Sequence, residues 1–312
     1  MLSGPDLRAG EPQISPPKAI TGAKRQHLRR ETRAGAFCLT DCPLTTMSQM
    51  VETEAPTQSE PATILITGAT GGIGAALARS FATPGRTLIL HGRDVVRLAS
   101  ICEECRKRGA HVVSLTFDLR EADAVTAALR AVSEQKSIDL AIVNAGVTQT
   151  IRDGEQVESL EAARDVLGVN LDGALATVAG VLPAMRRRGR GQIALMSSLA
   201  ALHGLAKTPV YCASKAAIKA YGESLRLWLA PQGIGVSVVL AGFVRTPMTE
   251  RIPGPKPGII SPDRAALLIR RGLERNRARI AFPWWLAGGL YSLSILPPPI
   301  AERILRRLGF GA

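Results

Sequence analysis

Short runs of apolar, often β-branched residues alternate with longer amphipathic segments along most of the chain. The apolar runs have the length and composition of strands that are covered on both faces. We expect strands at 63–66, 87–90, 112–117, 140–143, 193–196 and 236–240, and a seventh at 278–282. We expect helices at 75–81, 95–108, 121–135, 155–182, 212–230 and 262–274. This alternation predicts an α/β fold, a Rossmann-type doubly wound parallel sheet of about seven strands with helices on both faces.

Residues 1–60 show neither the period of two typical of strands nor the period of 3.6 typical of helices. They are rich in Pro, Gly, Ser, Thr and charged residues. That composition buries too little apolar surface to offset the entropy lost on ordering. We therefore expect a disordered N-terminal extension over 1–60 and a catalytic domain over 61–282. Met47 lies just before that domain, so residues 1–46 are either an over-extended reading of the start site or a regulatory tail. Mass spectrometry of the native N-terminus distinguishes the two.

A glycine-rich turn joins the first expected strand to the first expected helix. It reads TGATGGIG over 67–74, and strand, turn and helix together are the context that a dinucleotide-binding fingerprint requires. Glycines let the backbone approach a pyrophosphate, and the N–H groups that begin the helix attract its charge. The cofactor contacts expected in this turn are Thr67, Gly68, Thr70, Gly71, Gly72, Ile73 and Gly74.

The residues after the second expected strand bear on cofactor choice. NAD sites usually have an acidic residue there, bonded to the ribose 2′-hydroxyl. Gly92 holds that position here, and Arg93 follows it. Because a guanidinium suits a 2′-phosphate, we favour NADP(H) over NAD(H). The Asp94 carboxylate leaves NAD(H) as an alternative, because an acidic residue in this region suits its ribose 2′-hydroxyl. The other role for this carboxylate is to cap the next helix.

Tyr211 and Lys215 are four residues apart in an expected helix and therefore lie on the same face. An ammonium beside a phenol favours the phenolate and brings the tyrosine pKa nearer to neutral. Such a pair serves as a proton donor and acceptor, although this spacing also arises by chance on many helices. Ser198 ends an apolar run 13 residues upstream of Tyr211, where its hydroxyl can polarise a substrate carbonyl.

Taken together, these motifs resemble the short-chain dehydrogenase/reductase family in its compact single-domain form. The matching pieces lie in the family's order over roughly 62–250: TGATGGIG at 67–74, Asp118-Leu119, NAG at 144–146, Asn170, Ser198, YCASK at 211–215 and AGFVRT at 241–246. The resemblance implies an NAD(P)-dependent enzyme that interconverts a carbonyl and an alcohol by hydride transfer. It also implies a homodimer or homotetramer. The alternative is a catalytically silent cofactor-bound scaffold, which would be free to lose one of the catalytic residues.

The resemblance further implies a role for each matching residue. Tyr211 would be the general acid in reduction and the base in oxidation, while Lys215 would hold the nicotinamide ribose and lower the Tyr211 pKa. Ser198, rather than its neighbour Ser197, would bond the reacting oxygen, and Asn170 would hold a water for proton relay to Lys215. The other implied cofactor contacts are Asp118 and Leu119 at the adenine, Asn144, Ala145 and Gly146 near the central strands, and Val244 and Thr246 at the nicotinamide.

The net charge of +13 is concentrated in the second half of the chain. Residues 184–244 contribute +7 and residues 245–312 contribute +8, whereas residues 61–183 contribute −2. This excess suits an anionic partner, such as a phosphorylated cofactor, an acidic substrate or lipid headgroups, or is simply solvated surface. A nucleic-acid partner is not expected, because no recognisable module or interleaved aromatic residues accompany the charge.

The five cysteines give no disulfide framework, which fits a reducing cytoplasm. Cys102 and Cys105 form a C-x-x-C pair without a second pair of metal ligands, so we expect neither a metal site nor a redox site.

The segment beyond Thr246 is where the motifs end and substrate choice is expected to reside. Residues 247–260 are rich in Pro and Gly, as a mobile lid would be. The C-terminal segment, residues 283–312, begins with an apolar run shorter than the ~20 residues of a membrane span and ends with three arginines. It is a substrate-pocket wall, a subunit contact or a membrane-surface contact. We expect an apolar or lipid-like substrate and a cytoplasmic protein, or one peripheral on the membrane.

Overall fold

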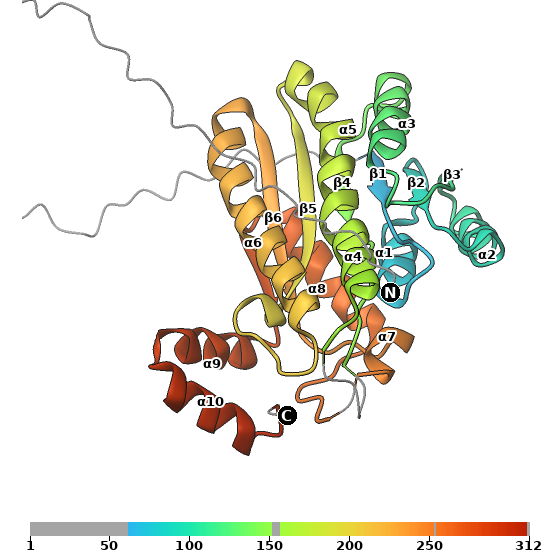
Figure 1. Ribbon diagram of the computed structural model, residues 1–312. Coiled ribbons are helices and arrows are strands. Elements are labelled where there is room, and N and C mark those ends of the chain that lie inside the picture. The colour runs from blue at the N-terminus through green and yellow to red at the C-terminus, as the bar shows by residue number, and fades with distance from the viewer. Residues whose placement is uncertain (1–61, 152–156, 253, 311–312) are drawn as a thin grey trace, which may run out of the picture. The chain divides into compact units, whose positions relative to one another are not determined.

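Seven parallel strands form a single sheet in the order β3-β2-β1-β4-β5-β6-β7 (Figure 1). The computed structural model describes residues 62–151, 157–252 and 254–310, so the expected N-terminal extension lies outside the described residues. The strands are β1 Thr63–Ile66, β2 Thr87–His91, β3 His111–Leu115, β4 Leu140–Val143, β5 Gly191–Ser198, β6 Ile234–Ala241 and β7 Arg279–Phe282. The predicted α/β architecture is confirmed.

Helices cover both faces of the sheet because the strands carry apolar side chains on both faces. On one face pack α1 (Gly72–Phe81), α2 (Val95–Lys107) and α8 (Pro262–Glu274). On the other pack α3 (Ala122–Gln135), α5 (Gly173–Arg188) and α6 (Pro209–Leu229). In Figure 1, α5 and α6 lie on one side of the sheet and α8 on the other.

The single helix expected over 155–182 is wrong. Residues 155–156 lie outside the described residues, and helix α4 begins at Leu160 and ends at Leu167. A π-helical turn over Gly168–Asp172 then leads into α5. Pro183 does not end α5; the helix continues to Arg188, where Gly189 adopts a left-handed φ of 62°. In the part of the chain that the structure describes, this 160–188 stretch alone has the length and apolar character of a membrane span, but most of it is buried.

The C-terminal part of the chain adds three helices at the carboxyl edge of the sheet. Helix α7, Pro247–Glu250, lies inside the expected lid, residues 247–260. The base of the lid is held by backbone hydrogen bonds, in which Arg245 N donates to Ile260 O (2.9 Å) and Ile260 N to Phe243 O (3.1 Å). After β7 and a cis Phe282–Pro283 peptide bond, the chain forms α9 (Trp284–Ile295) and α10 (Pro298–Arg307), drawn in red in Figure 1.

Candidate active site

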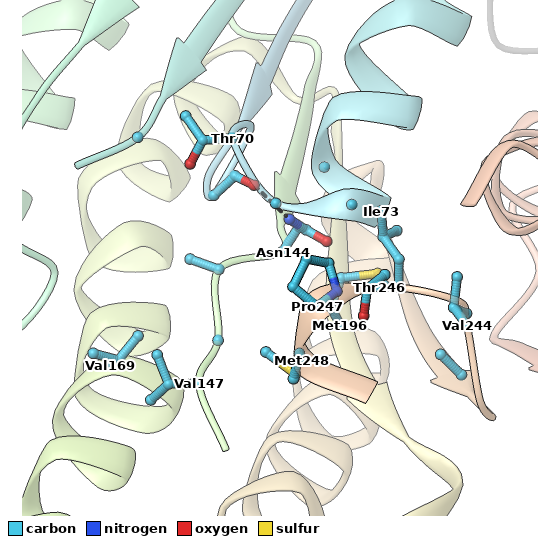
Figure 2. A pocket seen from close by; sticks show the side chains of 18 of the residues that line it. Thr70, Ile73, Asn144, Val147, Val169, Met196, Val244, Thr246, Pro247 and Met248 are labelled. Atoms are coloured by element: carbon cyan, nitrogen blue, oxygen red, sulfur yellow. Dashed lines mark hydrogen bonds between the residues drawn. The ribbon is translucent and has the colours of Figure 1, made fainter. Parts of the chain in front are cut away.

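A cavity of about 390 Å³ opens at the carboxyl edge of the sheet, between the glycine-rich turn and the lid (Figure 2). Every cofactor contact expected from the sequence lines this cavity except Thr67, and Ser198, Tyr211 and Lys215 line it too. Thr67 and Asn170 are not among its lining residues. The topology therefore brings together residues from eight segments that are distant in sequence.

The glycine-rich turn has the geometry of an anion-binding loop. Gly68 has a φ of 66°, in the left-handed region that favours glycine, and a Cβ on Gly74 would clash with the Gly68 carbonyl oxygen. Helix α1 starts directly after Gly71, with no side-chain cap and no acidic residue in its first turn. Its first N–H groups and positive dipole end therefore remain available to a phosphate. This cradle fits the pyrophosphate of a dinucleotide cofactor.

Thr67 connects two segments of the cavity wall, and its contact with the cofactor stays a prediction. It is fully buried, and its Oγ1 accepts hydrogen bonds from the backbone N–H groups of Asn144 (3.0 Å) and Ala145 (3.2 Å). The Asn144 side chain donates in return to Thr67 O (3.0 Å) and Gly68 O (3.2 Å), the second of which is drawn in Figure 2. These bonds fasten the end of β4 to the glycine-rich turn.

Tyr211 and Lys215 lie near the start of α6, on the same face. Lys215 Nζ is 5.7 Å from the Tyr211 ring centroid and donates to Met196 O at 3.0 Å. The Tyr211 hydroxyl is hydrogen-bonded to Ser198, so the expected pair is in fact a group of three side chains.

Burial moves the pKa values of both titratable groups. It raises the pKa of Tyr211 by more than the hydrogen bond with Ser198 lowers it. It also lowers the pKa of Lys215 to about 8. Lys215 was expected to lower the Tyr211 pKa, but the net direction of the Tyr211 pKa shift is upward. The reason is that loss of solvent around the phenol outweighs the other influences.

The two adjacent serines at the end of β5 have different environments. Ser197 is buried, and its hydroxyl donates to Lys215 O at 2.7 Å. Ser198 is half-buried and is the serine that bonds the Tyr211 hydroxyl. Its Oγ also accepts from Ala200 N (3.1 Å) at the start of the short helix Leu199–Ala201. Of the two hydroxyls, that of Ser198 is placed to act with Tyr211.

Ser198→Ala is expected to slow turnover by at least about a hundredfold, because the reacting oxygen loses a hydrogen-bond donor. Ser197→Ala is expected to lower the free energy of unfolding by about 1 kcal/mol and to leave turnover within about threefold. Steady-state kinetics and urea unfolding of both variants measure these effects. The opposite pattern, with turnover lost in Ser197→Ala alone, would contradict the assignment.

Asn170 lies in the π-helical turn and is almost fully buried. Its Oδ1 accepts from Val147 N (2.7 Å), and its Nδ2 donates to Val147 O (2.9 Å) and Ser214 Oγ (3.0 Å). A Cβ on Gly146 would lie 3.2 Å from both Asn170 Oδ1 and Lys215 Nζ, so the amide and the ammonium lie near one another. The side chain thus ties α6 to the loop after β4, and its role in holding a water stays a prediction.

The charged residues after β2 and β3 form the other end of the cavity. The Asp94 carboxylate accepts from Arg97 N (3.0 Å) and caps α2, which is the second of the two roles considered for it. Arg93 is exposed and lies 3.9 Å from Asp118. Arg120 binds the Asp118 carboxylate at 2.6 Å and, as the largest influence, lowers the Asp118 pKa to about 2. Asp118 is therefore ionised and already paired.

Several residues that line the cavity were not among the cofactor contacts or catalytic residues expected from the sequence. They are His91, Gly92, Asp94, Arg97, Val147, Val169, Met196, Ser197, Ala241, Gly242, Pro247, Met248 and Thr249. Most are sequence neighbours of the motifs, which is the only signal that could have found them. Val169 and Met196, close in sequence to Asn170 and Ser198, have apolar side chains that give no sign of a binding role, and Figure 2 shows them at the cavity.

The C-x-x-C pair shows no feature of a metal or redox site. Cys102 and Cys105 are buried in α2 as free thiols. Burial raises both pKa values, that of Cys105 to about 11, so the reactive thiolate is disfavoured. Within the described ranges, no group of three or more His, Cys, Asp and Glu side chains is arranged to hold a metal ion.

Comparison with known proteins agrees with this geometry. The family model for short chain dehydrogenases matches residues 62–256. The chain is similar to an uncharacterized oxidoreductase of Myxococcus xanthus, at 35% identity over 247 residues that cover 79% of this chain and 97% of that protein.

Two solved structures are also similar. One is a short-chain dehydrogenase from Sphingobium yanoikuyae in complex with NADPH, with a TM-score of 0.66, 29% identity, and coverage of 76% of this chain and 96% of that chain. The other is a bulky-bulky ketone specific alcohol dehydrogenase from Comamonas testosteroni. Its TM-score is 0.65 at 25% identity, with coverage of 79% of this chain and 94% of that chain. The chain belongs to the short-chain dehydrogenase/reductase family and is an NAD(P)-dependent oxidoreductase.

Proposed function

We propose that this protein reduces the carbonyl group of an apolar substrate to an alcohol, with NADPH as the preferred cofactor. The observation that carries the proposal is the hydrogen-bonded pair of Ser198 and Tyr211 at the cavity, with the Tyr211 pKa raised by burial. A phenol with a raised pKa is protonated at neutral pH. It is therefore in the state that donates a proton, which is the state that carbonyl reduction requires.

The side chains around the cavity divide the work of reduction between them. Bound NADPH supplies the hydride. Ser198 and Tyr211 orient the carbonyl oxygen by hydrogen bonds, and Tyr211 donates the proton to the oxygen as negative charge develops there. The Lys215 ammonium, when charged, favours the phenolate that remains on Tyr211. Oxidation of an alcohol uses the same groups in reverse.

The preference for NADPH rests on the residues after β2. Gly92 leaves no acidic side chain to repel a 2′-phosphate, and a Cβ there would clash with the Thr70 side chain. Arg93 and Arg97 both line this end of the cavity. The Asp94 carboxylate is engaged by the α2 backbone and by Arg97 (3.2 Å). Two guanidinium groups on the cavity wall favour the additional phosphate of NADPH.

An apolar substrate is supported by the wall next to Ser198. Leu199 is buried in a cluster with Ala287 of α9, and half-buried Leu202, Leu286 and Leu290 pack against it. Helix α9 therefore packs aliphatic side chains against the segment that follows the catalytic serine. The similar Comamonas dehydrogenase acts on bulky ketones, which is the class of substrate that such a wall admits.

The proposal is tested by incubating the purified protein with NADPH or NADH and a panel of apolar ketones and aldehydes. Loss of absorbance at the nicotinamide band is expected with NADPH and bulky apolar ketones, and should exceed that with NADH. Tyr211→Phe serves as the inactive control. Tight NADPH binding without turnover of any panel member would instead favour the silent scaffold.

The reduction is also expected to depend on pH through Lys215. Because burial lowers the Lys215 pKa to about 8, the ammonium is present below that pH and is lost above it. With NADPH varied, kcat/KM reports on the free enzyme, so it should be constant near pH 6.5–7 and fall about tenfold per pH unit well above pH 8. A flat profile to pH 10 would contradict a role for the charged lysine.

We further propose a homodimer or homotetramer located in the cytoplasm, as the family resemblance implies. Light scattering on the purified full chain gives its mass in solution, and a monomer at micromolar concentration would overturn the oligomer.

A further inference from the structure

The pair of helices at the C-terminus exposes a concentration of large apolar side chains. In the described residues, twelve large hydrophobic side chains are exposed, and half of these lie between residues 284 and 308. They are Trp284, Trp285, Ile295, Leu296, Ile300 and Leu308. Clustered exposure of this kind marks an interaction surface, whereas scattered single residues do not. We call these six residues, with Arg303, Arg306 and Arg307, the C-terminal face.

Helix α9 exposes large apolar side chains near both of its ends, and Ser292 and Ser294 are exposed as well. Ala287 and Leu293 are buried against the protein, while Trp284 is 81% exposed and Ile295 is 84% exposed. The helix has no charged residue, and a Cβ on Gly288 or Gly289 would meet open space. Large apolar side chains of an uncharged helix are normally buried, so these exposed side chains lack a covering partner in the described structure.

Helix α10 packs against α9 and supplies positive charge. Leu293 of α9 packs with Ala301 and Leu305 of α10, which holds the two helices together. Arg303, Arg306 and Arg307 are exposed, and none of them forms an ion pair with another described residue. Exposed tryptophans and aliphatic residues beside unpaired arginines are the combination that binds an anionic bilayer surface.

We propose that the C-terminal face docks the protein on the surface of an anionic lipid bilayer, with the exposed apolar side chains of α9 at the headgroup boundary. A second copy of the chain is the less favourable occupant. A two-fold contact buries the same patch on both copies, so it would bring the two sets of arginines together. A bilayer with anionic headgroups satisfies both the apolar side chains and the charge.

The C-terminal face is physically connected to the lid over the cavity. A Cβ on Gly258 of the lid would lie 3.0 Å from Trp285, and a Cβ on Gly309, next to Leu308, would lie 3.2 Å from Pro255 of the lid. Lid residues Pro247 and Met248 line the cavity itself (Figure 2). A docked protein would therefore hold the lid side of its cavity close to the bilayer, where an apolar substrate concentrates.

Vesicle flotation of the full chain tests the proposal without turnover, so its failure would leave the proposed reductase activity untouched. The vesicles contain phosphatidylcholine alone or phosphatidylcholine with phosphatidylglycerol. Flotation is expected with the anionic vesicles only, and should weaken as salt is raised. Arg303→Gln with Arg306→Gln and Arg307→Gln should weaken binding about a hundredfold, since each basic residue near such a surface contributes about 1 kcal/mol.

Trp284→Ala with Ile295→Ser should weaken binding at least about tenfold through the loss of apolar contact. Both side chains are exposed, so the fold should survive, which circular dichroism checks. The matched control is Leu227→Ser with Trp228→Ala, equally apolar and exposed at the end of α6, on the opposite edge of the sheet; it should float like the wild type. Equal flotation of all variants, or no flotation of the wild type, overturns the proposal. So does a wild-type dimer that Trp284→Ala dissociates, because a second copy would then cover the face.

Discussion

Tyr211→Phe is expected to reduce turnover by about 10²–10⁴-fold, the range over which a positioned general acid contributes. The phenylalanine keeps the ring beside Lys215 but removes the hydroxyl that Ser198 binds. The reacting oxygen then has no proton donor at the right position. Steady-state kinetics with NADPH and the best ketone of the panel measure the loss.

NADPH binding provides the control for this variant. The Tyr211 hydroxyl contributes little to the long cofactor cradle, so the NADPH dissociation constant from fluorescence titration should stay within about threefold. Turnover within tenfold of the wild type would remove Tyr211 from the role of general acid. Joint loss of binding and turnover would show that the substitution disturbs the cavity and not only the chemistry.

Arg93→Leu is expected to raise the KM for NADPH about tenfold to a hundredfold. A hydrogen bond to a charged group contributes about 1.5–3 kcal/mol, and Arg93 is exposed toward the cavity with only a long 3.9 Å pairing to Asp118. Its guanidinium is therefore available to a 2′-phosphate. The KM for NADH, which has no such phosphate, should change less than threefold.

Lys107→Leu is the matched control for this variant, because it removes a positive charge from the other end of α2 outside the cavity. It should leave both KM values unchanged. Equal effects of Arg93→Leu on NADPH and NADH would contradict recognition of the 2′-phosphate. They would indicate instead that Arg93 supports the adenine end in general.

Local features of the site were well predicted from the sequence. The glycine-rich turn lies between β1 and α1 as expected, and α8 spans the expected residues 262–274. The Tyr211–Lys215 spacing places both residues on the same side of α6. Each of these depends on residues within a few positions of one another, because helix geometry and capping are set by local backbone hydrogen bonds.

Features that depend on distant contacts were not predictable. Thr67 reads as part of a cofactor loop, yet its hydroxyl is bonded to the end of β4, 77 residues away. The helix expected to contain Asn170 is interrupted by a π-helical turn. In this turn the Asn170 side-chain amide is hydrogen-bonded to Val147 and Ser214. The Tyr211 pKa moves upward because burial, which no spacing rule reports, exceeds the effect of neighbouring groups.

The sequence by itself determined the alternation of strands and helices, the order of the motifs and the chemistry that the site can perform. These follow from periodicity and residue type, both of which are properties of the amino-acid sequence. Only the tertiary structure decided that Ser198 and not Ser197 joins Tyr211. It alone also showed that the tryptophans of α9 and the arginines of the adjoining helix α10 are exposed. The reason is that burial and side-chain contacts arise when helices and strands pack together, so they cannot be deduced from any one segment of the sequence.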